Sequence, residues 1–335
     1  MEMTWRVKMS KSNPWKEIVT PVDNSLAARI ADPTHPLEFY WAKDRYGRYL
    51  FVLHASENLV LSRNIPEPSG VRVELGFLDE EKKDQMRLIL VDEENYDIFY
   101  SLCRDLMAAT RNISDEQIAV SVIITRLERW QKFLRNAGRK IDERQIRGLF
   151  GELWFLKKEL IPLWGAYRAI EFWSGPRGDV HDFGIGSINV EIKTRPSTAR
   201  ANITVSSPEQ LWNEGGRLFL YVLAVAKAKG NEKEALSLRG LVQSIKKELA
   251  AFPEAQEMFE SLLMESGYID IEEFERPLFL PGSVQLYEVQ EGFPRLDPAS
   301  VPDGIEHIRF DLDLTKCREY MADKDLLNQA LKDER

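Results

Sequence analysis

Cysteine and histidine are scarce in this sequence, with two and four copies among 335 residues. Cys103 and Cys317 lie in opposite halves of the chain, and neither belongs to a C-x-x-C motif or to a Cys/His cluster. The sequence therefore indicates neither a disulfide framework nor a zinc site built on thiolates. Because free cysteines persist in reducing compartments, we expect a cytoplasmic protein.

Long apolar runs are also missing. The longest uninterrupted run, residues 218–226, is far shorter than the roughly 20 residues that cross a bilayer. Residues 1–20 are interspersed with charges and contain no apolar segment typical of a secretory signal. We therefore expect a protein without a membrane partner.

Positive charge is in deficit, with 45 Lys and Arg against 54 Asp and Glu. The net charge of -9 argues against a protein that coats nucleic acid through bulk positive charge. The deficit is uneven, however, because residues 143–230 hold 12 basic and 9 acidic side chains, whereas residues 231–335 hold 12 and 23. An anionic ligand would favour the middle of the chain.

Apolar residues are plentiful enough for a real core, at 44% of the sequence, and the length predicts about two domains. Residues 1–140 are typical of a small accessory α+β domain, which ends in a connecting helix and the polar segment 136–140. Its strands are expected at 37–41, 49–54, 71–77 and 86–91, and its helices from Asp92 and from Ser114 to about Asn136.

Residues 141–335 are expected to form the second domain, with a core at 141–230 and an acidic C-terminal extension at 231–335. A helix from Asp142 ends at Pro162 and Gly165, and Pro208 begins another helix. Strands are expected at 171–173, 180–185, 188–194, 217–226, 284–289 and 305–314. This mixture predicts an α/β core within a protein that is α+β overall.

The main candidate catalytic residues lie in the stretch 178–194. Residues two apart in a strand project to one face, so Glu191 and Lys193 point together. Asp182 belongs to the preceding strand, and a hairpin at 184–187 would bring it beside Glu191. Two carboxylates and one ammonium group would then share one edge of a sheet.

These residue types suit the hydrolysis of phosphodiesters. Carboxylate oxygens are hard ligands that hold Mg²⁺ while the ion keeps several waters. The metal polarises a phosphoryl oxygen and lowers the pKa of a bound water. Lys193 is a compact charge that can orient the attacking water or offset negative charge on the phosphate.

The pattern of Asp182 followed by Glu191-Ile192-Lys193 resembles the PD-(D/E)XK signature of restriction-endonuclease-like nucleases. In that superfamily a preceding helix often supplies another acidic residue, and Glu152 within GELWFL fits that place. Together with WSGP, HDF, VEIKT and SSPEQL, this segment resembles a bacterial family of PD-(D/E)XK motif proteins across most of the chain. His181 stands where the literal motif has proline, a departure that the superfamily tolerates.

The resemblance implies a restriction-endonuclease-like core with a central mixed sheet flanked by helices. It also implies a Mg²⁺ site, in which Mn²⁺ can substitute, with Asp182, Glu191 and the carbonyl of Ile192 as ligands. Lys193 would position the attacking water, and Glu152 would act as a ligand or through a metal-bound water.

The family pattern further implies that Gln210 lies near the scissile phosphate. Arg195 and Arg200 closely follow Lys193, and we expect them to contact backbone phosphates of DNA. Membership implies service in restriction or phage defence beside helicase, ATPase or methyltransferase partners. The oligomeric state stays open, a homodimer included.

Simpler interpretations stand beside these. The pattern E-x-K has little value alone, since residues 80–83 contain it twice in an expected solvated turn. The charged groups of the two strands would then form a cross-strand ion pair in place of a metal site, and Glu152 a surface or interhelical salt bridge. Asp179 is a rival to Asp182, and His181 is a candidate general base. Arg195 and Arg200 could instead be solvated.

The main hypothesis is a metal-dependent DNA endonuclease, an endodeoxyribonuclease of the PD-(D/E)XK kind. The alternative is a catalytically silent, nucleic-acid-binding or scaffolding subunit with the same fold, whose acidic region 231–335 docks a basic partner. A third interpretation is an accidental motif in an unrelated mixed α/β domain.

Overall fold

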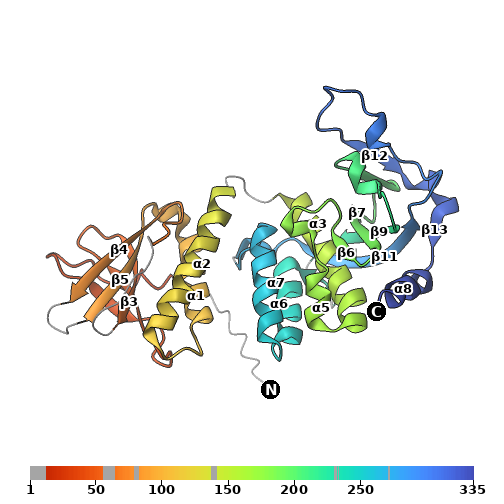
Figure 1. Cartoon of the computed structure of the whole chain (residues 1–335). Helices are drawn as coiled ribbons and strands as arrows, with labels where there is room; N and C mark the ends of the chain where they lie inside the picture. Colours follow the sequence, from red (N-terminus) through yellow and green to blue (C-terminus); the bar gives the residue numbers. More distant parts are fainter. Residues whose placement is uncertain are drawn as a thin grey trace, which may run out of the picture. The chain divides into compact units, whose positions relative to one another are not determined.

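The computed structural model describes residues 13–55, 65–78, 83–136, 142–229, 232, 234–270 and 272–335. The chain divides into two units, Met1–Arg139 and Lys140–Arg335 (Figure 1). The polar segment expected at 136–140 lies outside the described residues from 137 onward, as does most of the solvated turn at 80–83. No helix within the described ranges is both long and apolar enough to cross a membrane.

The N-terminal unit is a five-stranded antiparallel sheet with two helices. The strand order is β1-β2-β3-β5-β4, with β1 at Ala27–Ile30, β2 at Glu38–Lys43, β3 at Tyr49–Ala55, β4 at Val71–Leu78 and β5 at Lys83–Leu90. Helix α1 spans Tyr96–Ala109 and α2 spans Glu116–Asn136. Gly47, at φ 76°, lies in the turn between β2 and β3.

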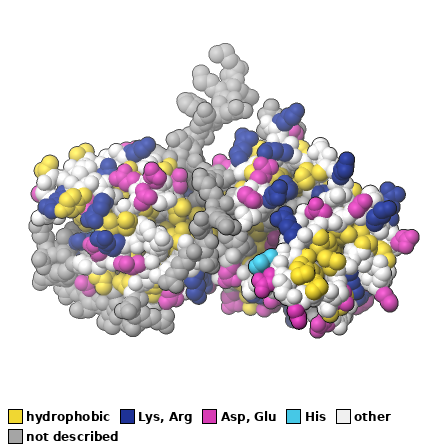
Figure 2. Space-filling view, turned by 90° about the horizontal axis from the view of Figure 1, so that it is seen from above, with side chains coloured by type: hydrophobic (Ala, Val, Ile, Leu, Met, Phe, Trp, Pro, Cys, Tyr) yellow, Lys and Arg dark blue, Asp and Glu magenta, His cyan; other side chains and the backbone are white. Residues whose placement is uncertain are grey.

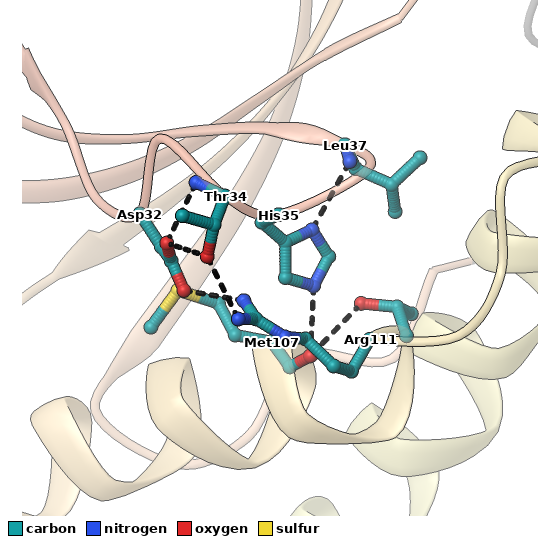
Figure 3. Close-up of polar contacts among 7 residues, drawn as sticks. Asp32, Thr34, His35, Leu37, Met107 and Arg111 are labelled. Carbon is teal, nitrogen blue, oxygen red and sulfur yellow. Dashed lines mark hydrogen bonds and ion pairs between the residues drawn. The ribbon is translucent and has the colours of Figure 1, made fainter.

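Aromatic packing and one polar cluster join this sheet to α1. The Trp41 ring lies 5.6 Å from that of Tyr100, and Trp15 stacks on Phe99 at 5.4 Å. Beyond the C-terminal end of α1, Arg111 donates to Asp32 and to Thr34 (Figure 3). His35 bridges the Met107 carbonyl and the Leu37 N–H. These bonds fix the segment that leads into β2.

The C-terminal unit contains a mixed sheet of order β10-β11-β9-β7-β6, with β13 paired to β11. Strand β7 runs parallel to β9, and the other pairs are antiparallel. The strands are β6 at Phe183–Ile185, β7 at Ile188–Pro196, β9 at Arg217–Lys227, β10 at Leu236–Ser237, β11 at Leu278–Glu288 and β13 at Met321–Ala322. Strands β8, at Asn202–Val205, and β12, at Phe310–Asp313, form a separate pair.

Helices pack around this sheet (Figure 1), which confirms the predicted mixed α+β fold with a helix-flanked sheet. They are α3 at Glu143–Phe155, α4 at Ile161–Trp164, α5 at Ala166–Glu171, α6 at Leu238–Leu249, α7 at Pro253–Glu265 and α8 at Lys324–Asp333. The capping box of Asp142 and Gln145 begins α3.

The two faces of the mixed sheet have different partners. Phe155 of α3 packs on Phe183 and Tyr221 at 5.0 and 4.9 Å. The opposite face carries a buried cluster that includes residues of β8 and β12. Glu191 is in register with Leu220 of that cluster, so Glu191 and Lys193 lie on the face opposite α3.

Some sequence-based boundaries are wrong. The helix expected from Pro208 is a single 3-10 turn, Pro208–Leu211, because the backbone becomes extended at Trp212. The strand expected at 171–173 is instead the end of α5 followed by one bridge. The helix from Asp142 continues through a π-helical turn at Leu156–Leu160 into α4 and ends at Gly165, as expected, whereas Pro162 is tolerated in the first turn of α4.

Gly151 allows α3 to approach β7 closely. A Cβ atom at this position would collide with Thr194 Cγ2 and lie 3.3 Å from Ile192 Cγ2. At Gly148, one turn earlier on the same helix, an added Cβ would have no neighbour within 4 Å.

We expect Gly151→Ala to lower the free energy of unfolding by about 1–3 kcal/mol, because the helix must move away from the sheet. Gly148→Ala is the matched control, and it should raise stability by roughly 0.5–1 kcal/mol through lower chain entropy. Urea unfolding measures both. Equal effects of the two substitutions would contradict the close contact of Gly151 with Thr194.

Candidate active site

The β6–β7 hairpin brings Asp182 and Glu191 to neighbouring positions. Phe183 pairs with Val190 and Ile185 with Ile188, so the next positions outward are Asp182 and Glu191. One carboxylate oxygen of Asp182 accepts the backbone N–H of Ile192 at 2.7 Å. The turn at 184–187 thus has the geometry that the sequence predicts.

A row of polar side chains follows the face of β7. Lys193 Nζ donates to Glu191 Oε1 at 2.6 Å and to Gln210 Oε1 at 2.9 Å. Gln210 Oε1 also accepts the N–H of Ser206 at 2.9 Å. Glu191 is only 1% exposed, so its contact with Lys193 is a buried ion pair.

Glu152 reaches this site from α3. Its Oε2 accepts the indole N–H of Trp173 at 2.9 Å, and Trp173 is fully buried. Burial and the neighbouring Asp182 carboxylate raise the pKa of Glu152 to about 8. The mutual effect of the two charges means that Glu152 and Asp182 belong to one cluster.

The segment WSGP, residues 173–176, forms a cradle for these carboxylates. The N–H groups of Ser174 and Gly175 donate to the Asp182 carbonyl at 3.0 and 3.1 Å. A Cβ atom at Gly175 would lie 3.1 Å from Asp182 Cα. Sequence reasoning missed this role and that of Trp173, although the recurrence of WSGP in the family resemblance was an available signal.

Burial dominates the electrostatics of the site. It raises the pKa of Glu191 well above the usual range, and the Asp182 carboxylate adds to that effect while Lys193 opposes it. Burial also raises the pKa of Asp182, against the influence of Lys193 and of the Ile192 N–H. Three crowded carboxylates therefore share one ammonium group, an arrangement that a cation would stabilise.

The donor set fits a divalent cation. Glu191 Oε2 is buried without a hydrogen-bond partner, and carboxylate oxygens are the preferred ligands of Mg²⁺ and Mn²⁺. Within the described residues, no three His, Cys, Asp or Glu side chains are already arranged to hold a metal. One reason is that Lys193 and the Ile192 N–H each occupy a carboxylate oxygen.

The other predicted residues lie nearby with looser contacts. Arg195 continues the β7 row, and its guanidinium makes hydrogen bonds of 3.4 Å while its Nε has no partner. Arg200 is exposed in the turn before β8, and Asp179 is exposed as well. The pKa of His181 is lowered by burial, against a hydrogen bond to the Trp212 backbone.

The family described as "Putative PD-(D/E)XK family member, (DUF4420)" matches residues 11–315. The chain belongs to this family. Membership confirms the predicted resemblance and supports a nuclease fold, and PD-(D/E)XK nucleases typically use divalent metals. No curated protein and no solved structure matches the chain in two further comparisons.

The PD-(D/E)XK pattern fits the geometry of the hairpin. Asp182 at the start of β6 and Glu191-Ile192-Lys193 on β7 lie side by side. In a strand, the N–H and C=O of one residue point to the same side. The Ile192 carbonyl therefore faces the same edge as its N–H, which donates to Asp182.

We expect the metal-free protein to lose stability as pH rises from about 5 to about 8. The pKa of Glu152 is about 8 in the folded state against an ordinary value of 4.5. Between these two pKa values the folded state therefore binds one more proton than the unfolded state. Its loss on raising the pH lowers the free energy of unfolding by on the order of a few kcal/mol. Urea unfolding in EDTA across this range measures the loss.

Glu152→Gln should reduce that pH dependence, because a neutral amide replaces one titrating carboxyl group while Asp182 and Glu191, whose pKa values are also raised, remain. Glu171→Gln changes an exposed residue of α5 and is the control. It should keep the wild-type slope of stability against pH. An unchanged slope in Glu152→Gln would contradict the raised pKa.

Proposed function

We propose that this protein is a metal-dependent DNA endonuclease that hydrolyses phosphodiester bonds in a bacterial restriction or phage-defence system. The observation that carries this proposal is the pair of the half-buried Asp182 and the buried Glu191 beside Lys193, with one oxygen of Glu191 left without a partner. A purely structural ion pair would not require a third carboxylate, the half-buried Glu152, in the same cluster.

In this proposal Asp182, Glu191 and the Ile192 carbonyl hold Mg²⁺, with Mn²⁺ able to substitute, and Glu152 supports the site. The bound cation would supply Lewis-acid polarisation of the phosphoryl oxygen. The partners implied by the family resemblance are DNA and helicase, ATPase or methyltransferase subunits.

The chain's own residues position the reactants. Lys193 orients the attacking water and offsets negative charge on the phosphate. The attacking water forms the new P–O bond and loses a proton to solvent. The bond to the 3′ oxygen breaks, and that oxygen takes a proton from solvent, which leaves a 5′ phosphate and a 3′ hydroxyl. Because Gln210 Oε1 accepts bonds from Ser206 and Lys193, its amide NH₂ group points away from both and is available to a phosphate oxygen. Arg195 and Arg200 contact flanking phosphates.

We expect the wild type to nick supercoiled plasmid in Mg²⁺ or Mn²⁺, and Lys193→Ala to lose about 100-fold or more of that rate. Lys227→Ala is the matched control, since Lys227 is exposed and paired with Glu143 at 2.8 Å. Gel electrophoresis of the plasmid forms gives the rates. Equal nicking by wild type and Lys193→Ala would refute the assignment.

A second candidate function is a silent scaffolding or nucleic-acid-binding subunit. It is favoured by the existing Lys193–Glu191 pair, which neutralises one carboxylate without a metal. Calorimetric titration with Mn²⁺ separates the two functions. A nuclease should bind Mn²⁺ and lose that binding in Asp182→Ala, whereas a scaffold should show no binding that depends on Asp182.

A further inference from the structure

The segment 208–213 is fixed to strand β7 at two points. Gln210 accepts from Lys193 at 2.9 Å, and Asn213 accepts from Asn189 at 3.3 Å. Between these contacts, the Trp212 backbone lies near His181 and acts to raise the pKa of its imidazole against burial. Trp212 therefore lies beside the candidate active site in a fixed position.

Arg295 rests on the ring of Trp212. Its guanidinium carbon is 4.5 Å from the ring centroid, and its Nη1 donates to the Leu211 carbonyl at 3.3 Å. Phe293, two residues earlier, is buried against Tyr320 at 5.2 Å. Stacking, one hydrogen bond and a buried neighbour thus hold Arg295 before any ligand arrives.

Arg295 lacks a counter-ion. No carboxylate forms an ion pair with it in the part of the chain that the structure describes. Arg217 offers a direct contrast, since it lies over Phe219 at 4.9 Å but also pairs with Glu288 at 2.7 Å. Glu209 and Glu214, the carboxylates nearest in sequence to Trp212, form no ion pair with Arg295 among the described residues.

A stacked guanidinium with free N–H groups is suited to the oxygens of a phosphate. Arg295 lies over Trp212, two residues from Gln210, which contacts Lys193. Figure 2 shows several Lys and Arg side chains on the face of the C-terminal unit that is uppermost in Figure 1.

We infer that Arg295, supported by Trp212, binds a backbone phosphate of DNA next to the scissile phosphodiester. The position of the scissile bond rests on the proposed nuclease function. The phosphate contact itself rests on the unpaired, stacked arginine.

Fluorescence anisotropy of a short labelled DNA duplex, with the full chain in Ca²⁺, tests this inference. We expect Arg295→Gln to weaken binding by about tenfold and to reduce the slope of log K against log salt by about 0.9. Arg217→Gln, the stacked but paired control, should change neither quantity. Trp212→Ala should weaken binding, and Trp212→Phe should restore most of it.

Wild-type affinity and slope in a folded Arg295→Gln variant would overturn the inference, and thermal unfolding verifies the fold. Plasmid nicking separates the two claims. If wild type nicks DNA but Arg295→Gln binds normally, only the Arg295 contact is wrong. If wild type binds DNA through Arg295 without nicking, only the nuclease function is wrong. Binding of an RNA duplex in place of DNA would overturn the choice of nucleic acid.

Discussion

The placement of two carboxylates side by side, Glu191 buried and Asp182 half-buried, is the constraint on which the candidate site depends. Asp182 and Glu191 raise each other's energy as anions, and removal from water adds to that penalty. Lys193 and the Ile192 N–H offset part of it. Glu191 Oε2 remains without a partner, so an added positive charge would stabilise the cluster. Apolar side chains at these positions would avoid the penalty and could make the protein more stable.

Elements far apart in the sequence hold this unfavourable cluster in place. The WSGP cradle binds the Asp182 carbonyl and anchors Glu152 through Trp173. The C-terminal helix α8 adds support from the other end of the hairpin, since Glu334, the residue that follows it, accepts from Ser187 in the turn. At its first residue, α8 pairs Lys324 with the buried Glu159 at 2.7 Å. One short helix therefore contacts both the hairpin that carries Asp182 and the helical segment that follows Glu152.

The parts of the site that are local in sequence could be predicted, and the long-range parts could not. Strand alternation and a turn at 184–187 are enough to place Asp182, Glu191 and Lys193 together. By contrast, the contact of Trp173 with Glu152 spans 21 residues and follows no periodic pattern. The same holds for Arg295, which comes from an irregular connection and reaches Trp212 only through tertiary packing. Tertiary contacts also explain the failed helix after Pro208, because the side chain of Gln210 binds Ser206 and Lys193.

The negative net charge is compatible with an anionic substrate because the charge is divided between buried and exposed groups. Three of the nine acidic side chains in residues 143–230, namely Glu152, Asp182 and Glu191, belong to the site itself. In the metal-free site their raised pKa values reduce the negative charge that a phosphate meets, and a bound divalent cation would instead offset the ionised carboxylates with its own charge. Arginines without carboxylate partners, such as Arg295 on its stacking platform, then determine the local field more than the total of -9 does. Such a protein would recognise nucleic acid through a few fixed cationic side chains near the site. The slope of log K against log salt concentration would then be small.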